Sequence, residues 1–138
     1  MPKTRQFREK TPESEKITLN LGFVDLGRID LLVQEGFYSN RSDFIRTAIR
    51  NQLDGHGEAV ARTIQRNTME LGLCDYSRAE LEALRDAGEV LHVKVVGLAR
   101  IASDVPPELA AAVIGSITVL GALQASAEVR QALAGRIH

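Results

Sequence analysis

The chain has 138 residues, of which 44% are apolar and 25% are charged, and this balance is typical of a soluble folded protein with one ordinary domain or two very small ones. Tryptophan is absent and aromatic residues make up only 4%, so cores must come from Leu, Ile, Val and Ala, and small cores of this kind gain from oligomerisation. The formal net charge of −1 excludes a uniformly basic body, although the residues through Leu53 carry nine Lys or Arg against seven Asp or Glu, and the remainder eight against eleven.

The first fifteen residues show no periodicity and contain two chain breakers, Pro2 and Pro12. They also hold four basic residues, which are Lys3, Arg5, Arg8 and Lys10. We expect a flexible basic arm over residues 1–15, with an ordinary disordered terminus as the alternative. The segment lacks the apolar core of a signal peptide, so we expect a cytoplasmic protein.

Residues 16–21 alternate between polar and apolar side chains, which predicts a strand with one buried face. The polar positions are Lys16, Thr18 and Asn20, and the apolar ones are Ile17, Leu19 and Leu21. Gly22 ends this strand.

Two amphipathic helices are predicted next. Leu26 and Ile29 lie on one face of the first helix, which Gly36 ends as a C′ residue. Ser39 is expected to cap the second helix, whose buried face ends near Leu53. The Gly55-His56-Gly57 break follows and is the main candidate for a domain boundary.

One strand and two short helices cannot bury enough surface alone, so a second copy is expected to complete this unit. The two strands would pair antiparallel over a shared core. We expect that core to contain Ile17, Leu19, Leu21, Leu26, Ile29, Phe37, Phe44, Ile45 and Ile49. A two-stranded ribbon fits the major groove of DNA, where Lys16, Thr18 and Asn20 are residue types that read bases. The alternative is an ordinary solvated polar face.

The start of the second helix offers backbone N–H groups and a positive dipole end, which together favour a phosphate. The residues placed there are Ser39, Asn40, Arg41 and Ser42. Such contacts fix the position of a protein on DNA and do not read its sequence. The alternative is a plain helix cap.

Residues 16–53, KITLNLGFVDLGRIDLLVQEGFYSNRSDFIRTAIRNQL, resemble the ribbon-helix-helix domain of the CopG/Arc/MetJ type. The resemblance lies in the alternating strand, the Gly36-Phe37 turn and the S-x-R-S-[DE]-x-I-R pattern from Ser39 to Arg46. Gly22 departs from the family, which often has Pro there. The resemblance implies an obligate dimer that binds double-stranded DNA with Lys16, Thr18 and Asn20, and it implies phosphate contacts by Ser39, Asn40 and Arg41. Regulators of this type often repress their own operon.

The remaining residues mix helical and strand signals. They predict first a helix over residues 58–71 closed by Gly72, and then a helix from a Ser77–Glu80 capping box to Gly88. A strand is predicted from Val90, and a turn or short Ala-rich helix after Pro106-Pro107. A second strand around residues 117–119 and a helix from Ser126 to Gly135 complete the chain. The sequences Val95-Val96-Gly97-Leu98 and Val119-Leu120-Gly121-Ala122 echo each other, but a repeat architecture requires three or more units. The apolar stretch over residues 109–123 is too short and too interrupted for a membrane span.

Several functions are open for this half. A metal sensor is disfavoured, because His56, His92, His138 and Cys74 lack ligand spacing, and no cofactor is expected. Cys74, the single cysteine, excludes an intrachain disulfide and is read as a small apolar filler. Catalysis is not expected, since no nucleophile and base stand at useful spacing.

Three binding functions remain for the second half. An antitoxin would carry a short polar tail that folds on its toxin, whereas the second half of this chain is apolar and contains predicted strands, which disfavours that function. We favour an oligomerisation module that joins dimers and raises avidity on adjacent DNA sites. A self-assembling structural protein anchored to DNA is the rival class.

Taken in order, the sequence predicts an α+β chain of four parts. These are a basic arm over residues 1–15, a ribbon-helix-helix domain over 16–53, a helical connector over 54–89 and a small α/β oligomerisation module over 90–138. The function that this organisation favours is sequence-specific transcriptional regulation by a repressor.

Overall fold

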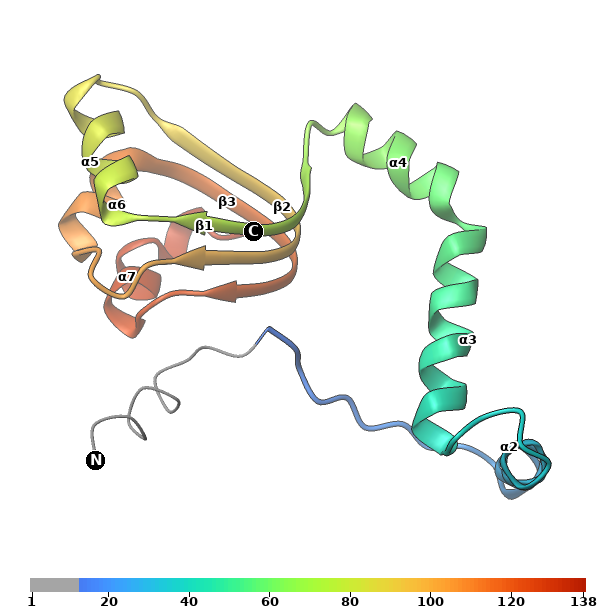
Figure 1. Cartoon of the computed structure of the whole chain (residues 1–138). Coiled ribbons are helices and arrows are strands. Elements are labelled where there is room, and N and C mark those ends of the chain that lie inside the picture. Colours follow the sequence, from blue (N-terminus) through green and yellow to red (C-terminus); the bar gives the residue numbers. More distant parts are fainter. Residues whose placement is uncertain (1–12) are drawn as a thin grey trace, which may run out of the picture. The chain divides into compact units, whose positions relative to one another are not determined.

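The computed structural model describes residues 13–138, so most of the expected basic arm lies outside the described residues. The chain divides into two compact units, a first unit up to Glu58 and a second unit over Ala59–His138. Figure 1 shows helices α2 and α3 in the first unit, and a three-stranded sheet with short helices in the second.

The first unit contains α2 (Phe23–Gln34) and α3 (Arg41–Gly55). Helix α2 ends as the sequence predicts, because Gly36 adopts a left-handed φ of +90°. Its N–H donates to the carbonyl of Val33, and the Phe37 N–H donates to that of Leu32. These two bonds satisfy carbonyls that the last turn of the helix would otherwise leave open.

The predicted two-stranded antiparallel ribbon is wrong for this structure. Residues 16–21 are extended and belong to no strand, and the sheet consists instead of three parallel strands, all in the second unit. A single segment has no neighbour with which to exchange backbone hydrogen bonds. Its alternation instead places Leu19 and Leu21 on the side that lines a groove with α2 and α3.

The cap of α3 also differs from the prediction. The N-cap residue is Asn40, not Ser39, and the Asn40 side chain accepts a hydrogen bond from the Asp43 N–H at 2.8 Å. The Asp43 carboxylate in turn accepts from the Ser39 N–H at 2.9 Å. Both residue types cap helices well, so the one-residue difference could not be resolved from the sequence.

The second unit alternates strands and helices. Its elements are α4 (Gly57–Arg66), β1 (Glu70–Tyr76), α5 (Arg78–Asp86), β2 (Leu91–Ile101), α6 (Pro107–Val113), β3 (Ile114–Gln124), α7 (Ala127–Ala132) and the 3₁₀ turn η1 (Ala134–Arg136). Ser77 and Glu80 form the predicted capping box. The predicted helix over residues 58–71 is too long, because Gly72 lies within β1 and does not end a helix.

The three strands pair in the order β1-β2-β3, and all pairs are parallel. Gly72, Gly97 and Gly121 stand in register across the sheet, with positive φ values of +124°, +138° and +123°. Figure 1 shows that β2 and β3 bend sharply along their length. Glycines within strands often mark such bends.

Each strand is followed by one helix, and we call each pair a rung: β1–α5, β2–α6 and β3–α7. The echo seen in the sequence therefore has three copies and not two, because Leu71-Gly72 aligns with Val96-Gly97 and Leu120-Gly121. Three rungs make a small parallel repeat array, in which each rung packs on its neighbour.

Helices and strands of the second unit enclose one hydrophobic core. It contains Leu81, Val93, Val95, Ala99, Ile101, Val105, Leu109, Ala110, Val113, Ile114, Ile117, Val129 and Leu133. Cys74 and Tyr76 pack against its β1 side and are half-buried. Burial raises the pKa of the Cys74 thiol and raises the pKa of Tyr76 to about 12.

Within the part of the chain that the structure describes, no helix is both long and apolar enough to cross a membrane.

Candidate nucleic-acid interface

The segment before α2 presents its polar side chains to solvent. Lys16, Thr18 and Asn20 are all exposed. On the alternate positions Ile17 is 83% exposed and Leu19 61% exposed, whereas Leu21 is half-buried. The segment thus keeps the two-sided character that the sequence predicts, with much of its apolar side uncovered.

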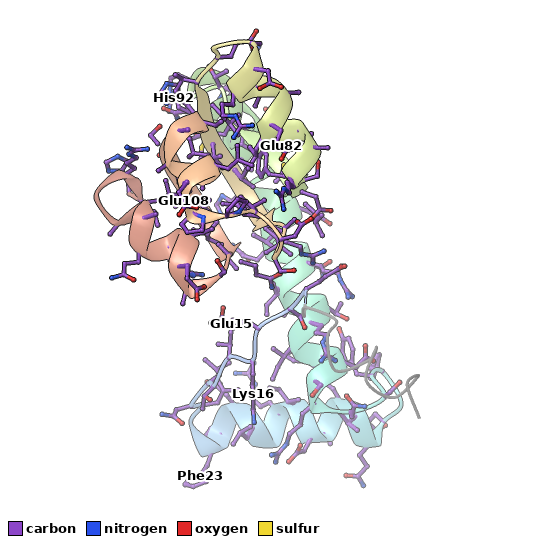
Figure 2. The ribbon with its side chains drawn as sticks, turned by 90° about the vertical axis from the view of Figure 1, so that its left-hand side faces the viewer. Glu15, Lys16, Phe23, Glu82, His92 and Glu108 are labelled. Carbon is purple, nitrogen blue, oxygen red and sulfur yellow. The ribbon has the colours of Figure 1, made fainter. Side chains whose placement is uncertain are left out.

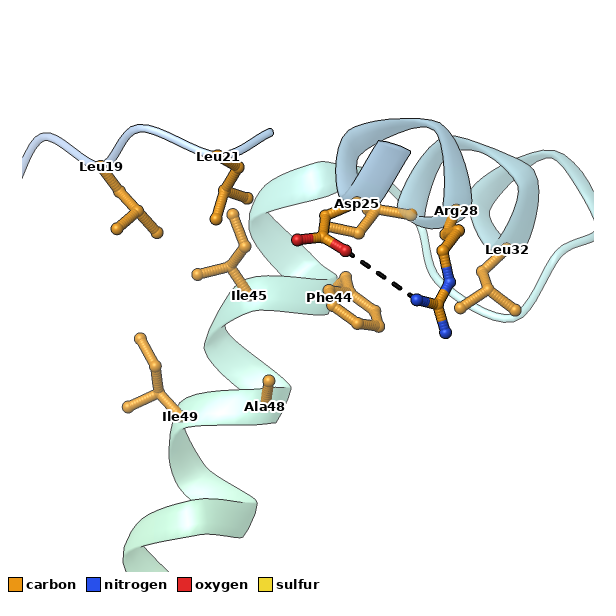
Figure 3. Close-up of a pocket in the computed structure, with 10 residues that line it drawn as sticks. Leu19, Leu21, Asp25, Arg28, Leu32, Phe44, Ile45, Ala48 and Ile49 are labelled. Carbon is orange, nitrogen blue, oxygen red and sulfur yellow. Dashed lines mark ion pairs between the residues drawn. The ribbon is translucent and has the colours of Figure 1, made fainter. Parts of the chain in front are cut away.

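An apolar groove with a volume of about 430 Å³ opens between this segment, α2 and α3 (Figure 3). Its lining residues are Leu19, Leu21, Asp25, Arg28, Ile29, Leu32, Phe44, Ile45, Ala48 and Ile49. All but two of these are apolar, and the two charged residues, Asp25 and Arg28, face each other at 3.9 Å. The structure therefore brings together most of the residues predicted to form a dimer core.

Few of those predicted core residues are buried in the single chain. Ile29 is the one buried apolar residue that the structure describes in the first unit. Leu26, Phe44 and Ile45 are half-buried, and Phe44 also meets the Tyr38 ring edge-on with centroids 5.0 Å apart. Phe37 and Ile49 are more than half exposed.

Further apolar residues add to this uncovered surface. Phe23 is 91% exposed, and Figure 2 shows its side chain projecting away from the ribbon at the start of α2. Val24 and Leu53 are also exposed. Phe23 was not among the predicted core residues, although it stands three residues before Leu26.

The four predicted phosphate-contacting residues lie together at the start of α3, and Ser39, Asn40, Arg41 and Ser42 are all exposed. Two backbone donors there are already engaged, since the Ser39 N–H and the Asp43 N–H bond to side chains. The acidic side chain of Asp43 thus occupies part of the place where an anion would otherwise bind.

Arg41 forms a bidentate ion pair with Asp30, which the sequence did not predict. Its Nε and Nη2 atoms donate to the two carboxylate oxygens, each at 2.8 Å. The hydrogen bond from Arg41 lowers the pKa of the Asp30 carboxyl, and the same bond raises the pKa of Arg41. Both side chains remain about half exposed.

This ion pair fixes the direction of the Arg41 guanidinium but does not use all of its donors. Arginine carries five N–H groups in a planar fork, and Asp30 engages one edge of it. The pairing also links α2 to the start of α3. No periodic pattern could have revealed it, because the two residues lie eleven positions apart on different helices.

The histidines do not gather into a metal site. His92 bonds through Nδ1 to Ser116 Oγ at 2.8 Å, and His56 lies near Gln52. Among residues 13–138, no group of three or more potential His, Cys, Asp or Glu ligands comes together.

Comparison with known proteins gives one match. Residues 12–130 match the profile of a ribbon-helix-helix transcriptional regulator family. No curated protein and no solved structure matches the chain. The match extends far beyond residues 16–53, where the sequence resemblance was noted, and it includes the three strands of the second unit.

Proposed function

The chain belongs to the ribbon-helix-helix transcriptional regulator family, whose members bind DNA, typically as dimers; from this premise we propose that it is a sequence-specific repressor. Residues 16–53 form its DNA-binding and dimerisation domain in this proposal. Lys16, Thr18 and Asn20 contact bases in the major groove. The operator includes DNA upstream of the protein's own gene.

The uncovered apolar surface of the first unit is the observation that carries the proposal. Among the described residues of this unit, Ile29 is the one buried apolar side chain and an open groove lies beside it, and so few buried residues cannot form a stable core alone. A second copy would cover Leu19, Phe37 and Ile49 and close the groove over both chains. Exposed apolar surface of this kind marks an interaction site.

The chemistry of the segment supports base contacts. Lysine donates to the O6 and N7 atoms of guanine, asparagine pairs with adenine through two hydrogen bonds, and threonine can meet a thymine methyl. The three side chains alternate along the segment and are exposed. In a dimer each half-site would meet the same three side chains.

The start of α3 would hold the phosphate backbone beside those bases. Asp30 engages Nε and Nη2 of Arg41, which leaves the Nη1 edge of the guanidinium to face a phosphate. The hydroxyl groups of Ser39 and Ser42 and the amide of Asn40 supply further donors. In this arrangement Asp30 orients the Arg41 guanidinium and does not prevent it from binding a phosphate.

The test is a titration of the purified protein against DNA from upstream of its gene and against scrambled DNA at two salt concentrations. The triple variant Lys16→Ala, Thr18→Ala, Asn20→Ala is expected to lose the preference for the upstream DNA. A good contact to a base contributes about 1–3 kcal/mol of discrimination.

A matched control makes the same three changes in the second unit, at Lys94, Thr63 and Asn67, which are exposed and lie outside β1 and β3. This control should keep the full preference. If the first triple variant discriminates as well as the unchanged protein, residues 16–20 are not the reader. Equal binding of both DNAs by the unchanged protein would instead favour a structural protein that coats DNA.

The second unit, in this proposal, joins DNA-bound dimers into larger assemblies. The observation behind it is the parallel sheet, which carries exposed leucines on both of its outer strands. Assembly of dimers on adjacent sites raises avidity without any new contact to a base.

A further inference from the structure

We infer that the second units assemble head to tail, with β1 of one copy continuing the sheet beyond β3 of another. The inference rests on the assembly role proposed above and names its partner, a second copy, and its geometry. It concerns surfaces of the second unit alone.

The contact that would join two copies already occurs twice within one chain. β1 pairs with β2, and β2 pairs with β3, in parallel and with the glycines in register. Among residues 13–138, no strand pairs with the edge of β1 that faces away from β2, and the edge of β3 that faces away from β2 carries only the bridge between Ile117 and Ile137. Unpaired parallel edges of this kind are templates for a further strand.

Exposure along one row of side chains points to a missing neighbour at each end. Leu71, Val96 and Leu120 lie side by side across β1, β2 and β3. Val96 in the middle is half-buried, whereas Leu71 and Leu120 at the two ends are 69% and 62% exposed. Head-to-tail pairing would place Leu71 of one copy beside Leu120 of the next and cover both.

The residues two positions further along β1 and β2 show the same difference in exposure. Leu98 on β2 is buried, whereas Leu73 on β1 is exposed. Repeat proteins that remain monomeric end in capping repeats with polar outer surfaces. In the part of the chain that the structure describes, the outer strands carry exposed leucines instead, which is the kind of surface on which a further repeat could pack.

The lengths of the two edges are complementary. β1 pairs with Val95 to Ile101 and has no residues opposite the start of β2. On β3 the corresponding start is already occupied, because Ile137 bridges to Ile117 and the His138 N–H donates to the Ile117 carbonyl at 2.8 Å. The segment of β3 beyond this bridge is the part that β1 of another copy would match.

The glycine column is compatible with this register. A Cβ atom at Gly97 would lie 2.2 Å from the Gly72 carbonyl oxygen, and one at Gly121 would lie 2.1 Å from the Gly97 carbonyl oxygen. The same position at Gly72 has no atom of a described residue within 4 Å. In the inferred pairing, the Gly121 carbonyl of the preceding copy would fill that space.

Head-to-tail pairing joins two different surfaces, so each added copy leaves one edge of each kind open. With dimers formed by the first unit, the second units would link neighbouring dimers along DNA. The predicted consequence is an assembly whose size rises with protein concentration, without DNA.

The test measures the mass of the full chain by light scattering over a concentration series, in the absence of DNA. The unchanged protein should exceed the mass of a dimer as concentration rises. The Leu71→Lys and Leu120→Lys variants should each remain dimers, because either substitution places a lysine charge in the contact between β1 of one copy and β3 of the next. Val90→Lys is the matched control, since Val90 is 60% exposed in the same unit but lies outside β1 and β3, and it should assemble like the unchanged protein.

Mixing the two edge variants makes the test specific for head-to-tail pairing. The Leu71→Lys chain keeps its β3 edge and the Leu120→Lys chain keeps its β1 edge, so an equimolar mixture should form assemblies larger than either variant alone. The inference is overturned if the unchanged protein stays a dimer throughout. It is also overturned if Leu120→Lys has no effect, which would indicate β1 pairing with β1, or if the mixture gives no increase, which would indicate packing of sheet faces.

A separate titration distinguishes failure of the inference from failure of the proposed function. Both edge variants should bind a duplex with a single site as tightly as the unchanged protein does. Loss of single-site binding by the unchanged protein would refute the regulator proposal and leave the mass measurements to decide the pairing.

Discussion

Replacing Gly97 by alanine should destabilise the second unit more than the same change at Gly72. Both glycines adopt positive φ values, +138° and +124°, in a region that is costly for residues with a side chain. Only at Gly97 would the added Cβ also meet a backbone carbonyl, that of Gly72, at 2.2 Å. The pair of variants therefore separates backbone strain from close packing of strands.

The magnitudes follow from these two terms. Strained backbone costs about 1–3 kcal/mol at either position. Overlap with the neighbouring strand adds about 1–3 kcal/mol at Gly97 alone, because the strands must move apart. Total stabilities of small proteins are about 5–15 kcal/mol, so the Gly97 variant should lose a substantial part of its stability.

Urea unfolding followed by circular dichroism would measure both variants, at a dilution where the unchanged protein is not assembled. A difference of about 2 kcal/mol corresponds to a shift of roughly 1 M in the urea midpoint for a typical small protein. If the two variants unfold at the same urea concentration, or if the Gly72 variant is the less stable, the close approach of the strands does not explain the glycines.

Three further predictions concern single side chains. Arg41→Ala should weaken binding to cognate and scrambled DNA alike and reduce the salt slope of binding by about 0.9. Titrations at several salt concentrations would measure this, and a loss of affinity confined to one DNA sequence would contradict a phosphate contact. Ser77→Ala removes the side-chain half of the capping box of α5 and should cost about 0.5–2 kcal/mol in urea unfolding, whereas Ser103→Ala, in an exposed turn, should cost nothing measurable. Burial raises the pKa of Tyr76 to about 12, above its ordinary value of about 10. The folded state therefore holds the phenol proton more tightly than the unfolded state does. The free energy of unfolding is then retained below pH 10 and falls as pH rises from about 10 to 12. Tyr76→Phe should flatten that fall in a pH series of unfolding measurements, and an unchanged slope would show that another group causes it.

Local signals in the sequence predicted much of this fold. The Ser77–Glu80 capping box and the Gly36 helix end depend on neighbouring residues alone, and both are confirmed. The strand from Val90 and the short helix after Pro106-Pro107 are present for the same reason. The resemblance of residues 16–53 to ribbon-helix-helix domains is confirmed by the family match.

Features that depend on distant partners were missed. Gly72 was read as the end of a helix, because its role is visible only beside Gly97 of the next strand. Because the segment around Gly72 was not recognised as a strand, the repeat in the sequence had two units instead of three. The Asp30–Arg41 pair joins two helices, and no local spacing encodes it. The antiparallel ribbon was wrong for a related reason, since a segment without a neighbouring chain forms no strand.

The most direct test of the central claim is protection of guanine N7 from methylation, because this atom lies in the major groove. The protein bound to DNA from upstream of its gene should protect specific guanines. The variant with Lys16, Thr18 and Asn20 replaced by alanine should lose that protection even at concentrations that saturate the DNA. Full binding without N7 protection, or protection that persists in the triple variant, would contradict major-groove reading by these three residues.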